Sequence, residues 1–169
     1  QSGALLPSFL AVTNRKLSNM QLIREGNERV LSARLADAKF FFDEDRKTSL
    51  ADRVAKQSAV TFHQKLGSLH QKTQRVVAMA AHVAGQLGVD QLIQDCRRAA
   101  LLSKADLLTG IVGEFPTLQG IMGGEYAQHD GESEVVWKAI RDQYLPRGME
   151  GELPETVSGR IVALADRMD

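Results

Sequence analysis

The chain has 169 residues and a formal net charge of zero, because 21 Lys and Arg balance 21 Asp and Glu. Its length suits one domain with a sizeable core, and 43% hydrophobic residues exclude a wholly disordered chain. The charge balance excludes a module that binds nucleic acid by bulk positive charge alone, which leaves local contacts with RNA open. Aromatic residues make up only 5%, so we expect an aliphatic, mainly helical core.

Residues 1–17 are predicted to form an extended arm or the remnant of a preceding domain. Their apolar stretch, 4–12, is broken by Pro7 and followed by a polar run. The chain starts with Gln-Ser-Gly and stops inside a helical pattern, so we expect a piece of a longer protein, truncated at its C-terminal end. The single cysteine, Cys96, is expected to be a buried thiol, and no apolar run approaches the roughly 20 residues of a membrane span.

Residues 18–169 are predicted to form one helical domain that begins with a long helix over 18–43. Apolar side chains of this helix share an arc of about 140° at about 100° per residue, namely Val30, Leu31, Leu35, Ala38, Phe41 and Phe42. Asn27 and Arg34 lie inside this arc, where an unpaired charge is costly. Arg34 is therefore expected to make an internal ion pair or to contact a partner, and the ion pair is favoured.

Further helices are predicted over 50–59, 71–87, 92–108, 116–127, 133–145 and 156–165. Gly88 is expected to cap the end of one helix, Asp90 is expected to be the N-cap of the next, and Ser133 and Glu134 are expected to start another. The run 43–47 is interpreted as a solvated charged turn. Since no period-two alternation is sustained, the predicted fold class is mainly α.

One weak pattern resembles the metal-dependent phosphohydrolases of the HD type, in which a His, a His-Asp pair and a final Asp hold the metal. His70, Asp106 and Asp166 fall in that order, but the His of the pair is missing and Lys104 would repel a cation. We therefore predict an HD-like helical bundle without a metal site. An active phosphohydrolase stays as the alternative, and it would need His63 or His129 as a replacement ligand.

Lys104 and Asp106 also stand out because both charges lie within an apolar helical pattern. Buried charges are uncommon unless they pair or meet a partner. A structural ion pair or network is the favoured interpretation, and contact with a partner is the other.

Longer motifs resemble the β subunit of the bacterial two-subunit glycyl-tRNA synthetase, and they span almost the whole chain in the family's order. These motifs are GNERVLSARLADAKFFFDED at 26–45, KLGSLHQKTQRV at 65–76, KADL at 104–107, VGEFPTLQGIMG at 112–123, Tyr126-Ala127, HDGE at 129–132 and YLPR at 144–147.

The resemblance implies a non-catalytic helical module of a cytoplasmic glycine–tRNA ligase. In that family the α subunit holds the aminoacylation site with ATP and Mg, and the β subunit brings in tRNA(Gly). An interior part of the β chain is a degenerate HD-type domain. The expected partners are accordingly the α subunit and tRNA(Gly), and neither a membrane nor a cofactor of this segment's own is expected.

The resemblance carries no catalytic or metal-binding residue over to this chain. Five positions stay as candidates for structural roles or for contacts with tRNA or the α subunit, namely Asn27, Arg34, Lys104, Glu114 and Gln119. Glu114 precedes Phe115-Pro116, which favours a place at a helix N-terminus, where its charge suits the helix dipole.

Overall fold

The structure is a computed structural model that describes residues 6–14 and 19–169. It divides into two units, Gln1–Lys39 and Phe40–Asp169, with the division inside the first helix. The boundary predicted at residue 17 and the helix start predicted at Ser18 lie outside the described residues. Residues 6–14 contain neither helix nor strand, and their side chains are exposed.

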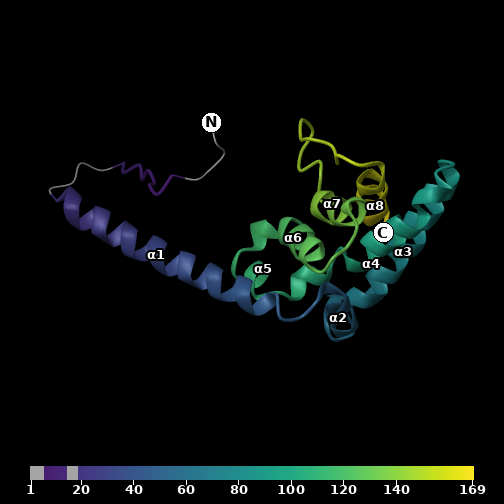
Figure 1. Cartoon of the computed structure of the whole chain (residues 1–169), viewed down its shortest axis with the longest axis horizontal. Coiled ribbons are helices and arrows are strands. Elements are labelled where there is room, and N and C mark those ends of the chain that lie inside the picture. The colour runs from purple at the N-terminus through teal and green to yellow at the C-terminus, as the bar shows by residue number, and fades with distance from the viewer. Residues whose placement is uncertain (1–5, 15–18) are drawn as a thin grey trace. The chain divides into compact units, whose positions relative to one another are not determined.

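The predicted mainly-α fold class is confirmed (Figure 1). The α-helices of the described residues are α1 (Met20–Asp45), α2 (Leu50–Val54), α3 (Leu69–Gln86), α4 (Ile93–Leu102), α5 (Gly110–Glu114), α6 (Ile121–His129), α7 (Glu134–Asp142) and α8 (Val157–Met168). Short 3₁₀ helices cover Ala55–Ala59, Asp90–Leu92, Ala105–Leu108 and Pro116–Leu118. A small antiparallel hairpin pairs β1 (Thr61–His63) with β2 (Gly67–Ser68), which the sequence analysis did not predict.

The core of the second unit lies where α3 packs on α4 and α8, and where α7 packs on α4, α6 and α8. Many of its fully buried positions are small, among them Ala80, Ala84, Ala99, Ala100, Ala139 and Ala165. Small side chains let helix backbones approach closely. Cys96 is fully buried and unpaired, which confirms its prediction as a structural thiol.

Hydroxyl caps explain where several helices begin. The Ser68 side chain accepts from Gln71 N–H in a capping box that starts α3, and Ser133 caps α7, which confirms the predicted start of a helix there. Gly88 follows α3 with a φ of 67°, as expected for a residue just past a helix end. The prediction for Asp90 was wrong, because it is the first residue of a 3₁₀ helix and makes no capping bond.

Two predicted helices are interrupted. The helix expected over 92–108 ends at Leu102, where the Ser103 hydroxyl donates to Ala100 C=O, and a 3₁₀ helix follows. The helix expected over 116–127 is a 3₁₀ turn, then Gly120 at φ 81°, then α6. A residue with this φ cannot continue a right-handed helix.

The long first helix is present, but its apolar arc is covered only at its C-terminal end. Phe42 stacks on Tyr126 with ring centroids 5.8 Å apart, whereas Leu31 and Leu35 are exposed. Arg34 is exposed as well, so it does not lie in a core, and its ion pair stays a prediction. None of the described helices combines the length and apolar character needed to cross a membrane.

Candidate functional site

Two lysines and two aspartates form a buried charged group, the lysine–aspartate cluster of Lys72, Lys104, Asp166 and Asp169. Lys104 Nζ lies 2.7 Å from Asp166 Oδ2, and Lys72 Nζ lies 3.1 Å from Asp166 Oδ1. Lys72 Nζ also lies 3.1 Å from Asp169 Oδ2. Each of the four side chains is at most 14% exposed. Asp166 is thus held by an ammonium group on each carboxylate oxygen.

Separate parts of the fold supply these charges. Lys72 comes from the first turns of α3, Lys104 from the break after α4, and Asp166 from the last turn of α8. The Lys104 ammonium also lies 4.1 Å from the centre of the Tyr144 ring, a cation–π contact. The cluster therefore joins α3, α8 and the segment after α4.

Burial and neighbouring charges shift the pKa values of the cluster residues in opposite directions. Burial lowers the pKa of Lys104, although the neighbouring Asp166 opposes this effect. Burial alone would raise the pKa of Asp166, but the ammonium groups of Lys104 and Lys72 together bring it below its ordinary range. The arrangement keeps both partners ionised in a poorly solvated place, as the favoured structural interpretation of Lys104 predicted.

Asp106 lies beside this cluster but has a different partner. Its side chain is fully buried, and Oδ2 accepts a 2.6 Å hydrogen bond from Gly120 N–H, while Oδ1 has no hydrogen-bond partner. Burial raises the pKa of Asp106 to about 6, and the Gly120 hydrogen bond and Lys104 only partly oppose this. Asp106 therefore fixes the Gly120 turn that precedes α6.

The residues present do not fit the metal site of an HD-type enzyme. His70 is half-buried in the first turn of α3 with Nδ1 unpartnered, and Asp106 is bonded to Gly120. Across residues 6–14 and 19–169, no three His, Cys, Asp or Glu side chains come together in a group that could hold a metal ion. A divalent cation at Asp166 would also meet two ammonium groups, which would repel it.

The histidines suggested as replacement ligands have contacts elsewhere. His63 Nδ1 accepts from Lys65 N–H in the hairpin, and His129 Nδ1 lies 3.0 Å from Arg46 Nη2 at the end of α6. The structure therefore gives the alternative phosphohydrolase no additional ligand.

An open depression on the surface brings together two of the motifs singled out in the sequence. It is lined by Pro116, Thr117 and Gln119 of the 112–123 motif and by Tyr144 and Arg147 of the 144–147 motif, and we call it the motif depression. Arg147 is exposed, and Gln119 and Tyr144 are half-buried. The depression is therefore lined by the exposed guanidinium of Arg147, the amide of Gln119 and the aromatic ring of Tyr144.

Two of the other candidate residues take places different from those expected. Glu114 is exposed and is the last residue of α5, so its predicted place at a helix N-terminus was wrong; the chain bends at Phe115 before the next turn starts. Asn27 is partly exposed on α1 in the first unit, and no structural role is evident for it.

Asp45 is a buried structural residue that the sequence analysis missed when it interpreted 43–47 as solvated. Its carboxylate accepts from the backbone N–H groups of Gly110 and Ile111 at 2.8 and 2.9 Å, and from the Tyr126 hydroxyl at 3.2 Å. Arg53 donates to its backbone oxygen at 2.6 Å. Only partners distant in sequence explain this burial, so no local signal in a charged run could have revealed it.

Fold and site together define a helical module in which Asp166 is held in a buried salt-bridged cluster. Comparison with known families identifies it further. The family model described as "Glycyl-tRNA synthetase beta subunit" matches residues 1–169. The chain belongs to this family.

Similar proteins named "Glycine--tRNA ligase beta subunit" cover the chain almost completely. Identity is 46% to that of Pediococcus pentosaceus over 100% of the chain, 50% to that of Desulforudis audaxviator over 99%, and 49% to that of Myxococcus xanthus over 99%. The chain spans only 25%, 25% and 24% of these relatives, respectively. The matched segment is about a quarter of their length.

Proposed function

We propose that this chain is a non-catalytic helical module of the β subunit of a cytoplasmic glycine–tRNA ligase. It supports binding of tRNA(Gly) and assembly with the α subunit, so that the whole enzyme attaches glycine to tRNA using ATP. The observation that carries the proposal is the family match over residues 1–169, with 46–50% identity to named relatives. ATP and Mg are assigned to the other subunit, as in the family that the sequence resembles.

The lysine–aspartate cluster supports a non-catalytic role for this segment. A metal-dependent hydrolase needs carboxylates free to hold a cation and acidify its water. Here both oxygens of Asp166 are already within 3.1 Å of an ammonium group. The cluster instead consists of buried ion pairs that connect α3, α8 and the segment after α4.

The motif depression is the surface we assign to tRNA. Arg147 can pair with a backbone phosphate, and Tyr144 and Gln119 offer a ring edge and an amide beside it. Lys104 is only 4% exposed and supports this surface from beneath through its contact with the Tyr144 ring. Among the candidate residues, Gln119 therefore has the place best suited to a direct contact, and Lys104 acts through the Tyr144 ring.

The test is glycylation by the complete β subunit together with its α subunit. Arg147→Ala should raise the KM for tRNA(Gly) about 5- to 10-fold and reduce the slope of log KM against log salt by about 1, as expected for one lost phosphate contact. Arg97→Ala, at another exposed arginine on α4, is the matched control and should change neither.

An Arg147→Ala enzyme with the KM of the control would contradict the assignment of this surface to tRNA. If the variant instead weakened association of the two subunits at an unchanged KM, the motif depression would belong to the α subunit interface.

A further inference from the structure

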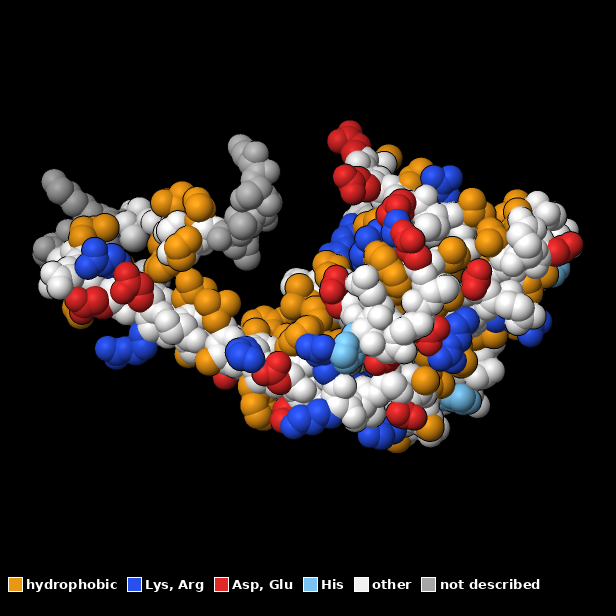
Figure 2. All heavy atoms as spheres, in the orientation of Figure 1, with side chains coloured by type: hydrophobic (Ala, Val, Ile, Leu, Met, Phe, Trp, Pro, Cys, Tyr) orange, Lys and Arg blue, Asp and Glu red, His pale blue; other side chains and the backbone are white. Residues whose placement is uncertain are grey.

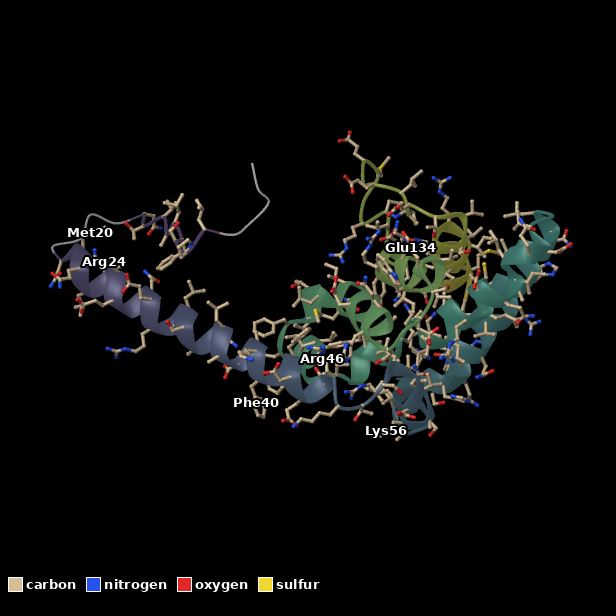
Figure 3. All side chains as sticks on the ribbon, viewed as in Figure 1. Met20, Arg24, Phe40, Arg46, Lys56 and Glu134 are labelled. Atoms are coloured by element: carbon tan, nitrogen blue, oxygen red, sulfur yellow. The ribbon has the colours of Figure 1, made fainter. Side chains whose placement is uncertain are left out.

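The first unit exposes apolar side chains on one side of α1, which we call the α1 apolar face: Met20, Val30, Leu31 and Leu35. Their exposed fractions are 61%, 63%, 38% and 62%. At about 100° per residue the four fall within one arc of about 140°. Figure 2 shows hydrophobic side chains at the surface along this helix, and Figure 3 marks its start at Met20 and its later part at Phe40.

The same side of the helix is covered where α1 enters the second unit. There Phe42 stacks on Tyr126, and Phe41 lies so close to Gly110 that a Cβ at that glycine would be 2.5 Å from the ring. The α1 apolar face is thus the continuation of a side of the helix that is already used for packing. Exposed contiguous apolar surface of this kind marks an interaction site.

The chemistry of the face selects a protein partner. Between Met20 and Phe42 the arc contains two charged side chains, Arg24 and Arg34, and one amide, Asn27, and is otherwise aliphatic or aromatic. A nucleic-acid surface would need several cations along one side. Hydrophobic burial is what this face offers.

The comparisons indicate where that partner comes from. The chain accounts for 24–25% of the length of its relatives. About three quarters of a complete β subunit therefore lies outside this chain. The extended segment 6–14 is equally uncovered, with Leu10 and Val12 100% and 98% exposed. We propose that the α1 apolar face packs against another part of the same β subunit and is an intrasubunit interface.

Hydrogen exchange compares the complete β subunit with the 169-residue chain. In the complete subunit the amides of 20–35 should exchange at least about 100-fold more slowly than in the chain, because packing stabilises a helix that is marginal when exposed. The double variant Leu31→Glu plus Leu35→Glu should abolish this extra protection. Ala36→Glu, which adds the same charge on the opposite side of α1, should retain it.

Three results would overturn the proposal. The first is equal exchange of 20–35 in the complete subunit and in the chain, a comparison of wild-type proteins that needs no variant to fold. The second is protection that appears only when the α subunit is added. The third is a dimer of the chain that Leu31→Glu plus Leu35→Glu dissociates, which would make a second copy the occupant. None of these readouts depends on glycylation, so they test the interface separately from the proposed function.

Discussion

Replacement of Asp166 by asparagine tests whether the lysine–aspartate cluster stabilises the fold. Asp166→Asn removes the charge shared by Lys104 and Lys72, whose side chains are only 5% and 10% exposed. Breaking a buried ion pair from one side typically costs about 3–5 kcal/mol, because the partner charge is left uncompensated. Lys72 keeps Asp169, so Lys104 is the charge left without a carboxylate partner at hydrogen-bond distance.

Replacement of Lys104 by methionine should partly restore the stability that Asp166→Asn loses. Lys104→Met removes the buried ammonium and leaves Asp166 paired with Lys72 at 3.1 Å, so it should cost less than Asp166→Asn. The double variant should be more stable than Asp166→Asn alone, because it contains no stranded Lys104 charge. We expect a coupling free energy of about 1–3 kcal/mol between the two positions.

Urea unfolding followed by circular dichroism gives the free energies of unfolding for this cycle. Glu28→Gln is the control, since it makes the same change of carboxylate to amide in the exposed Arg24–Glu28 pair, whose side chains are 67% and 53% exposed. That change should cost less than about 1 kcal/mol. An Asp166→Asn cost as small as the control, or strictly additive effects in the double variant, would refute the reasoning.

Three further changes have defined outcomes. Because burial keeps a proton on folded Asp106 up to a pKa of about 6, the contribution of Asp106 to stability should fall by about 2–3 kcal/mol as pH rises from about 4 to about 7, through the raised pKa. Asp106→Asn has no carboxyl group to titrate. Urea unfolding at both pH values should therefore show that the free energy of unfolding of the variant rises relative to that of wild type by this amount. A difference that does not change with pH would contradict the assignment. Asp45→Ala should cost about 3 kcal/mol or more in the same assay, since it leaves two buried N–H groups and a tyrosine hydroxyl without their acceptor, and a loss below about 1 kcal/mol would show that water replaces it. Gly123→Ala should cost about 1–3 kcal/mol in thermal unfolding, because its Cβ would lie 2.9 Å from Asp106 Oδ2 and from Ile140 Cγ2, and an unchanged melting temperature would show that α6 can shift.

Local signals in the sequence were enough for most of the helices. The helix start at Ser133, the glycine after α3 and the periodicity within 18–43 are signals that act within one or two turns, and the structure has a helix at each place. The break at Ser103 and Lys104 was not predictable in this way. It places Lys104 beside its counter-charge, Asp166, which is 62 residues away.

In the candidate site too, the residues could be singled out from local signals, but their partners depend on contacts between distant parts of the chain. The sequence singled out Lys104, Asp106 and Asp166, but it could not show that Lys104 pairs with Asp166 while Asp106 turns to Gly120. Lys72 was not considered, because a lysine near the start of a helix is usually solvated. Its burial depends on α8, which packs against α3 only in the folded chain.

Divalent metal content tests the central claim, which is that the ammonium groups of Lys72 and Lys104, and not a metal ion, neutralise the buried Asp166. The protein is purified without chelator and measured by elemental analysis. We expect well below one ion per chain, because Lys72 and Lys104 already neutralise Asp166. One tightly held ion per chain, lost together with Asp166, would contradict it and would direct the next assays to phosphate hydrolysis.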